Sequence, residues 1–371
     1  MDTVRFLAID LAKNVFQVHG VDAAGRLVLR RRVGQVQLTE LVLRLAPCTI
    51  GMEACSSAHH WARQFQQQGH TVKLISPRFV KPFVKGNKTD GNDAEAICEA
   101  LQRPSMRFVP IKSVEQQDVQ SLHRARSRLV SNRTGLVSQM RGILAERGIV
   151  FAQSITRARR ETPAVVADTS NALTPLAREM LADLMDQLRE LDKRIAGFDR
   201  RIDAVFKASE TCQRLAQIEG VGPKTATAIV AAVSDPKDFR NGRHFAAWLG
   251  LVPRQSSSGD RTHLLGISKR GDRHLRTLLI HGARAVLRTA PTKHDKKHAW
   301  ALALQARRGA NRAIVAIANK MARTTRIALR TRLHGWQQWF DQYPQFVVND
   351  RRFHPWASVV LVPEVNSSPR K

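Results

Sequence analysis

Short apolar runs alternate with amphipathic stretches over residues 4–76, a pattern that is typical of an α/β domain. The first run, at 4–10, is continuously apolar and predicts a strand that is buried on both faces. The next two runs follow across short turns, so three consecutive antiparallel strands are expected. In chain order, the predicted elements are strands at 4–10, 14–22 and 26–33, a helix at 38–46, a strand at 49–54, a helix at 57–69 and a strand at 71–76.

Two long helical stretches occupy the middle of the chain. The first runs from Val114 to about Leu144 and mixes leucines with arginines and serines. The second begins after Pro175 and has an apolar residue at every third or fourth position over more than three heptads, which predicts a coiled coil. Such a coil fits either a hairpin within one chain or an arm that joins copies of the chain. Its apolar positions are Leu181, Leu184, Leu188, Leu191, Ile195, Phe198, Ile202 and Val205.

The region from 208 to 330 is predicted to be mainly helical and opens with a candidate helix-hairpin-helix, IEGVGPKTATAIV. Gly220 and Gly222 would form its turn, and Thr225 would begin a helix whose N–H groups can hold a phosphate. Lys224 adds a positive charge, although a plain helix turn fits the same residues. Farther on, the basic residues of GISKRGDRHLR have a spacing that suits either a helix N-terminus on a nucleic-acid backbone or a solvated basic face. These residues are Lys269, Arg270, Arg273 and Arg276.

The charge of the chain narrows the choice of partner. Its 371 residues include 60 Lys and Arg against 31 Asp and Glu, which gives a net charge of +29. Such an excess favours a polyanion, because each phosphate that a cation neutralises releases a counterion. A basic membrane-surface protein is the main alternative, but the chain shows no basic amphipathic helix and no lipidation motif. Nucleic acid is therefore the expected partner.

Cysteine spacing, hydropathy and length indicate the location and the domain count. The four cysteines form no C-x-x-C pair, which predicts neither a zinc site nor a disulfide framework. Because no signal segment or run of membrane-spanning length is found, we expect a reducing, cytoplasmic location without a membrane partner. The predicted domains are an α/β domain with the long basic helix at 1–150, a coiled coil at 151–207, a helical domain at 208–330 and an aromatic-rich tail at 331–371.

Four acidic residues stand where a buried core does not explain them. Asp10 and Glu53 end predicted strands, and Glu53 lies on the opposite face from Met52. Asp90 and Asp93 lie at i and i+3 on one helix face. Each acid alone also fits a structural role, as a turn former at a strand end or as an N-cap and N3 pair of a capping box.

The predicted strand order is that of the ribonuclease-H-like fold, which brings its first strand, a later strand and a helix end to one point. Clustered carboxylates without Cys or His ligands suit Mg²⁺. Two such ions can clamp the attacking and leaving oxygens of a phosphodiester. The four acids therefore point to cutting or transferring a nucleic-acid strand.

Together these features resemble one family closely. From residue 4 to about 330, the chain is similar to the DEDD transposases of insertion-sequence family one-ten and its eleven-eleven subgroup, which are described as bridge-RNA-guided recombinases. The motifs that carry the resemblance are, in order, AIDLAKN, GMEAC, KTDGNDAEAI, IEGVGPKTA, FAAWLGLVP, SSG and GISKRGDRHLR. This family has an N-terminal RuvC-like domain, a coiled coil and a C-terminal transposase domain. Its members assemble as tetramers on donor and target DNA and are guided by a non-coding RNA of their own element.

The resemblance assigns roles to individual residues. It implies that the four acids form a Mg²⁺-binding tetrad and that Ser258, in the loop PRQSSSGDR, attacks a DNA phosphate to form a covalent phosphoserine link. The RuvC-like and transposase domains of different protomers would combine into each active site of a bacterial, nucleoid-associated enzyme. The chain departs from the family in Asp272, where Asn is commoner, and in the extra serines Ser256 and Ser257. The position next to Gly259 favours Ser258 as the nucleophile.

Other interpretations stay open on the residues alone. A RuvC-type nuclease would use the acids with water as the nucleophile, and a non-catalytic nucleic-acid-binding scaffold would keep them for structure. An actin-like sugar kinase or ATPase shares the strand order, but 113–207 contains none of the Gly-rich phosphate loops that it requires. Tyr343 is the single tyrosine and lies away from every motif, which argues against a tyrosine recombinase. In the helix at 114–144, Arg124 and Arg128 are candidates for contact with RNA.

Overall fold

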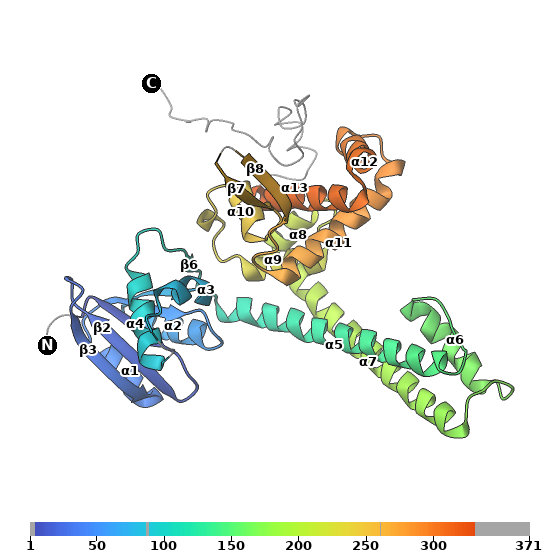
Figure 1. Cartoon of the computed structure of the whole chain (residues 1–371), viewed down its shortest axis with the longest axis horizontal. Helices are drawn as coiled ribbons and strands as arrows, with labels where there is room; N and C mark the ends of the chain where they lie inside the picture. The colour runs from blue at the N-terminus through green and yellow to red at the C-terminus, as the bar shows by residue number, and fades with distance from the viewer. Residues whose placement is uncertain (1–3, 87–88, 260, 331–371) are drawn as a thin grey trace. The chain divides into compact units, whose positions relative to one another are not determined.

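The computed structural model describes residues 4–86, 89–259 and 261–330. These residues form two compact units (Figure 1). The first ends at Gln117 and also includes Val233–Asp235, and the second takes the remaining described residues from Asp118 onward. Within the described ranges, no helix is both long enough and apolar enough to cross a membrane. The aromatic-rich region predicted at 331–371 lies outside them.

The first unit is built on a mixed sheet. Its strand order, β3-β2-β1-β4-β5-β6, is consistent with a ribonuclease-H-like domain. Strands β1, β2 and β3 pair antiparallel, whereas β4 lies parallel to both β1 and β5. The predicted strands are confirmed, and a short sixth strand was not foreseen. The strands are β1 (Phe6–Asp10), β2 (Val15–Val21), β3 (Leu27–Gly34), β4 (Thr49–Glu53), β5 (Thr71–Ile75) and β6 (Phe108–Val109).

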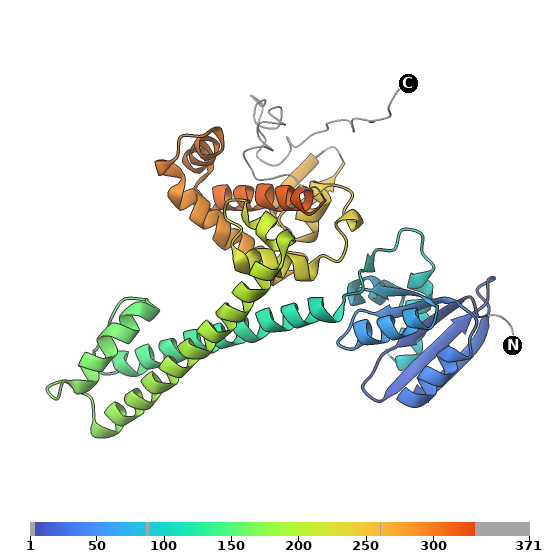
Figure 2. The same cartoon turned by 180° about the vertical axis from the view of Figure 1, so that it is seen from behind.

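Helices cover both faces of this sheet (Figures 1 and 2). Leu7 and Ile9 of β1 pack in the core beneath α1 (Gln35–Leu43) and α2 (Ala58–Gln67). Ala8, on the opposite face, packs in the core with α3 (Pro77–Val80) and α4 (Asp90–Leu101). The continuous apolar run of the first strand therefore has the two-sided burial expected of it. A short 3₁₀ turn, η1 (Lys81–Phe83), links α3 to the segment before α4.

The first helix differs from its predicted position. It was expected at 38–46 and is found three residues earlier, at Gln35–Leu43. The Gln37 side chain accepts a hydrogen bond from the Gly34 N–H at 3.0 Å, which satisfies a free donor at the helix start. Pro47 follows the C-cap residue Arg44 closely, and prolines restrict the backbone before them.

Two long helices, which from Asp118 onward belong to the second unit, lie side by side in both views (Figures 1 and 2). They are α5 (Val114–Ala145) and α7 (Pro175–Ala208), joined through α6 (Ile155–Ala167). Met140 of α5 packs in one core with Leu181, Met185 and Leu188 of α7. The first half of the predicted apolar seam, from Leu181 to Leu191, thus packs against the first helix of the same chain.

The rest of the second unit is mainly helical. Helix α11 (Arg273–Thr289) packs against α13 (Ala310–Arg330), and at Gly282 its backbone closely approaches Gly220 in the turn before α9. A two-stranded hairpin, β7–β8, is its only described sheet. The elements are α8 (Glu210–Ala216), α9 (Pro223–Ala232), η2 (Pro236–Asp238), α10 (Gly242–Trp248), β7 (Pro253–Ser258), β8 (Arg261–Ile267), α11 (Arg273–Thr289), η3 (Ala290–Thr292), α12 (Lys296–Arg308) and α13 (Ala310–Arg330).

Candidate functional site

Asp10 and Glu53 occupy the ends of two neighbouring parallel strands. β1 and β4 pair with Ile9 opposite Met52, so the two acids that follow leave the sheet at the same edge. Both acids are half-buried. By alternation, Asp10 shares the face of Ala8, and Glu53 shares the face of Gly51. This is the face that α4 covers, because Ala8 packs with α4 and Gly51 lies against Leu101.

Asp90 and Asp93 lie in the first turn of α4. Asp90 is not the N-cap that a capping box would require: Thr89 caps the helix by accepting a hydrogen bond from the Asn92 N–H at 3.3 Å. Asp93 lies four residues before Ile97 and so on the same face of α4. Ile97 is fully buried and packs in one core with Ala8 of β1. Both acids therefore lie on the helix that covers the face of Asp10 and Glu53, and at the end of that helix where acidic residues are electrostatically favoured.

The four carboxylates are not gathered into a closed set of metal ligands. Within residues 4–86, 89–259 and 261–330, no group of three or more His, Cys, Asp or Glu side chains is close enough to hold a metal ion. The backbone brings the strand-end pair together at one sheet edge, and α4 packs on both of these strands. The donors are carboxylates alone, which fits a hard, oxygen-preferring cation such as Mg²⁺.

The serine-rich sequence had indicated a loop, but Ser258 is the last residue of strand β7. β7 pairs antiparallel with β8, and Ser258 lies opposite Arg261 at the end of the hairpin. All three serines are exposed, and Ser257 accepts a hydrogen bond from the Gln255 amide at 2.8 Å. Gly259 has φ +56°, and a side chain added there would meet no atom within 4 Å. The hydroxyl of Ser258 is therefore accessible from outside the hairpin.

The turn before α9 has one packed glycine and one open glycine. Gly220 has φ +88°, and a Cβ there would lie 2.8 Å from the Met321 methyl and 2.9 Å from Val286. Gly222 is exposed and has nothing within 4 Å. α9 begins at Pro223, two residues earlier than predicted, and the Thr225 side chain is buried. Gly222 and Pro223 are thus the exposed part of this turn.

Glu219 fixes the same turn and was not singled out from the sequence. Its carboxylate accepts hydrogen bonds from Lys293 at 2.5 Å and from His298 at 3.2 Å, and Lys297 binds it as well. Burial alone would raise the pKa of Glu219, but these cations lower it to about 2. The carboxylate is therefore charged at neutral pH and ties the turn to α12.

The basic stretch before α11 divides into exposed and engaged side chains. Lys269, Arg270 and Arg273 are exposed. Arg276 is half-buried and donates a hydrogen bond to the Leu249 carbonyl at 3.0 Å. Asp272, the residue at which the chain departs from the family pattern, is the N-cap of α11 and accepts from the Leu275 N–H at 3.0 Å. Asn caps helices equally well, so the departure preserves this function.

The arginines of α5 also divide into two sets. Arg124 and Arg128 are exposed, whereas Arg126 and Arg133 form ion pairs with Asp199 and Asp192 of α7, respectively. The exposed pair lies four residues apart on one helix face, so both guanidinium groups are available to a partner outside the chain.

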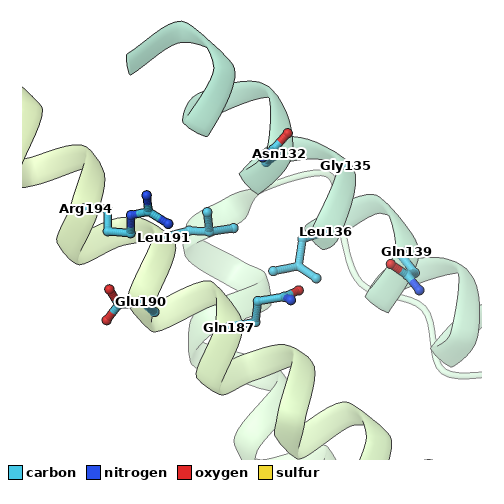
Figure 3. Close-up of a pocket in the computed structure, with 8 residues that line it drawn as sticks. All are labelled: Asn132, Gly135, Leu136, Gln139, Gln187, Glu190, Leu191 and Arg194. Atoms are coloured by element: carbon cyan, nitrogen blue, oxygen red, sulfur yellow. The ribbon is translucent and has the colours of Figure 1, made fainter. Parts of the chain in front are cut away.

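A groove of about 430 Å³ lies between α5 and α7 (Figure 3). Leu136 and Leu191 form its apolar part, and polar side chains from both helices surround it. It contains neither the acids nor Ser258, so we do not assign it a catalytic role. The lining residues are Asn132, Gly135, Leu136, Gln139, Gln187, Glu190, Leu191 and Arg194.

His123 joins α5 to α9 and α11. Its Nε2 lies 3.0 Å from the Thr227 hydroxyl, and its ring lies 5.4 Å from that of His274. The side chain is buried. Burial, followed by the charges of His274, Arg126 and Lys224, lowers the pKa of His123 to about 4. The imidazole is therefore neutral at physiological pH.

Stability should fall in acid because of His123. The unfolded chain takes up this proton near pH 6.5 and the folded chain only near pH 4, so stability is lost as the pH falls through this window. The loss attributable to His123 is at most about 3 kcal/mol. Urea denaturation of the wild type and of His123→Gln at pH 7, 6 and 5 should show the difference between them shrinking with acid. Exposed His281→Gln is the control, and a difference that is constant with pH would contradict the prediction.

Comparison with known proteins identifies the class. Residues 7–148 match a family model described as a transposase, and residues 212–299 match the model of the transposase IS116/IS110/IS902 family. Together these matches span both the acids and Ser258, and the chain is a DNA transposase.

Relatives along most of the chain specify the family. A probable family 20 transposase of Pseudomonas aeruginosa is 52% identical over 85% of this chain and 94% of its own length. The transposase for insertion sequence element IS1111A of Coxiella burnetii is 48% identical over 87% of this chain and 88% of its own length. The transposase for IS1328 of Yersinia enterocolitica is 39% identical over 87% and 96%, respectively. The chain belongs to the IS110 family of DEDD transposases.

Proposed function

We propose that this transposase cleaves and rejoins donor and target DNA through a covalent phosphoserine intermediate at Ser258. The Ser258 Oγ would bond to the phosphorus of a DNA phosphodiester while the deoxyribose oxygen leaves as a hydroxyl. Attack by another DNA hydroxyl on the same phosphorus would release Ser258 and rejoin the strand. The observation that carries the proposal is the exposed end of β7, where Ser258 stands beside the open Gly259.

The carboxylates of Asp10, Glu53, Asp90 and Asp93 would hold Mg²⁺, most simply as a two-ion site. Bound there, the ions would supply stabilisation of the charge that develops on the phosphoryl oxygens. The chain itself contributes two acids at one sheet edge and two on the helix over the same face. The acids belong to the first unit and Ser258 to the second, and the family resemblance implies that different protomers would supply them to one active site.

Nucleic-acid contacts follow from the accessible basic groups. The turn at Gly220–Thr225, acting as a helix-hairpin-helix, and the stretch at 269–276 would hold DNA phosphates. An element-encoded guide RNA would lie on the exposed arginines of α5, Arg124 and Arg128. The α5–α7 pair would act as the coiled coil of a tetramer or dimer of dimers. The net charge of +29 supports this distribution, as does the exposure of Gly222 in the turn and of Lys269, Arg270 and Arg273 before α11.

Ser258→Ala tests the covalent step. The variant should lose the protein–DNA adduct that denaturing gels resolve from free DNA in reactions on element-end duplexes with Mg²⁺. Ser257→Ala is the matched control, since Ser257 is an exposed neighbour on the other face of β7, and it should keep the adduct. Continued strand cleavage by Ser258→Ala, without an adduct, would instead support a RuvC-type nuclease that uses water.

A further inference from the structure

Asp199 of α7 binds two cations that come from different helices. Its carboxylate accepts from Arg126 of α5, with 2.5 Å between Oδ1 and Nε and 3.4 Å between Oδ2 and Nη2. The same carboxylate lies 3.1 Å from Lys224 Nζ, at the start of α9. Burial alone would raise the pKa of Asp199, but the two cations lower it overall, so Asp199 is charged at neutral pH.

A second carboxylate of α7, one heptad away, makes a comparable pair of contacts. Asp192 accepts from Arg133 of α5 at 3.0 Å and from Arg159 of α6 at 2.5 Å. Both aspartates thus link α7 to α5 through an arginine. They differ in the second cation. At Asp192 this cation is Arg159 of α6, whereas at Asp199 it is Lys224, to which the proposed function assigns a DNA contact. Asp192 therefore provides an internal reference for a purely structural role.

The contact between Asp199 and Lys224 is open to exchange. The side chain of Lys224 is 38% exposed and that of Asp199 28% exposed. Gly222, two residues earlier, is exposed with no atom near the position of a Cβ, so a bulky ligand can approach the turn. A carboxylate and a phosphate present similar oxygen acceptors to the same ammonium group. Lys224 can therefore change from one anion to the other without moving its helix.

We propose that Asp199 occupies the position on Lys224 that a phosphate of duplex DNA takes on binding. The proposal rests on the proposed function, which assigns Lys224 a DNA contact. When a phosphate takes Lys224, Asp199 keeps Arg126 through two nitrogen atoms, so no carboxylate is left unpaired in a partly buried site. Asp199 thus acts as an internal competitor that lowers the affinity of the turn for DNA in general.

Such competition has a use in a chain of this charge. A net charge of +29 favours binding to any DNA through counterion release alone. An internal anion at a contact point weakens each non-specific encounter by a constant factor. Because the same factor applies to every site, it leaves the ratio of affinities unchanged and shortens the time that the chain spends on DNA where no further contacts form.

Asp199→Asn and Asp192→Asn form a matched test, because each removes one negative charge and one ion pair between α5 and α7. Fluorescence anisotropy would measure binding of the full chain to a mixed-sequence DNA duplex at several salt concentrations. Asp199→Asn should bind about fivefold tighter, in keeping with a partly exposed ion pair, and Asp192→Asn less than about twofold tighter. Asp199→Glu keeps the charge and should bind as the wild type does.

Lys224→Gln separates the failure of this proposal from the failure of the DNA contact. Alone, it should weaken binding and reduce the salt slope by about one. Combined with Asp199→Asn, it should remove the gain. Equal gains for the two aspartate variants, a gain that survives in the double variant, or a gain with an RNA hairpin but not with the duplex would each overturn the competitor role. Unchanged binding by Lys224→Gln alone would overturn the DNA contact itself, and the competitor role with it.

Discussion

Asp10→Asn should abolish DNA strand cleavage by this transposase while leaving its fold intact. Asparagine matches aspartate in size and can keep hydrogen bonds at the end of β1, but it lacks the negative charge that the proposed Mg²⁺ site requires. A loss of several kcal/mol of transition-state stabilisation corresponds to a rate roughly a thousandfold lower. The measurement is the initial rate of cleavage of an element-end duplex with Mg²⁺ present.

The control for this loss is Glu40→Gln, which removes the same charge from an exposed position on α1, across the sheet from α4. It should cleave at the wild-type rate. DNA binding by Asp10→Asn, measured without cleavage, should stay within about twofold of the wild type. Asp10 is not one of the residues to which a contact with DNA phosphates is assigned. If Asp10→Asn cleaved at nearly the wild-type rate, the strand-end acids would be structural. That result would support the interpretation of the chain as a non-catalytic nucleic-acid-binding scaffold.

Gly282→Ala should destabilise the second unit strongly. A Cβ on Gly282 would overlap the carbonyl oxygen of Gly220 and lie 3.1 Å from the Met321 methyl. The first of these neighbours is backbone, in a turn that Glu219 also holds, so it cannot rotate away. Overpacking against a fixed backbone should cost about 3 kcal/mol or more in the free energy of unfolding. Urea denaturation followed by circular dichroism would measure the loss.

The matched control is Gly142→Ala, because Gly142 is also a glycine inside a helix of the second unit. A Cβ at Gly142 meets nothing within 4 Å. Alanine should therefore raise stability there by about 0.5–1 kcal/mol, through helix propensity alone. The same substitution should thus have opposite signs at the two positions. A drop of similar size at both would show that the loss at Gly282 reflects helix composition, not the contact with Gly220.

The parts of the structure that the sequence predicted well are those with a hydrophobic period. The strands of the first unit and the long helix at Val114–Ala145 bury one or both faces, so their apolar positions repeat in a way that can be recognised locally. The placement of Asp10 and Glu53 on one face followed from this alternation. Whether the four acids act together as ligands is a matter of side-chain distance, which alternation does not determine.

The β7–β8 hairpin was missed for the corresponding reason. Arg254 to Ser258 are exposed on both faces of β7, so no apolar alternation marks the strand. The usable signal was the Gly-Asp pair between two runs rich in Ser, Thr and Leu, since two such residues between extended segments favour a hairpin.

Long-range contacts also escaped prediction. Gly220 was assigned to a turn on its residue type, and its packing against α11 depends on a residue more than sixty positions away. The pairing of Asp199 with Lys224 likewise joins α7 to α9, and that these two helices lie close together is known only from the folded structure. The seven-residue spacing of Asp192 and Asp199, matched by that of Arg126 and Arg133, was present in the sequence but carries meaning only once α5 and α7 are known to pair.

Because β7 pairs with β8 in a fixed register, the number of residues in the serine run matters more than which residues they are. Successive residues of a strand point to opposite faces, so Ser256 and Ser258 share a face and Ser257 points away. Deleting one serine would move the last hydroxyl before Gly259 to the other face, although a serine would still precede the glycine. Point substitutions at 256 and 257 would leave the Ser258 hydroxyl on the same face of β7. Evolution of this segment should therefore accept exchanges of side chain far more readily than single-residue insertions or deletions.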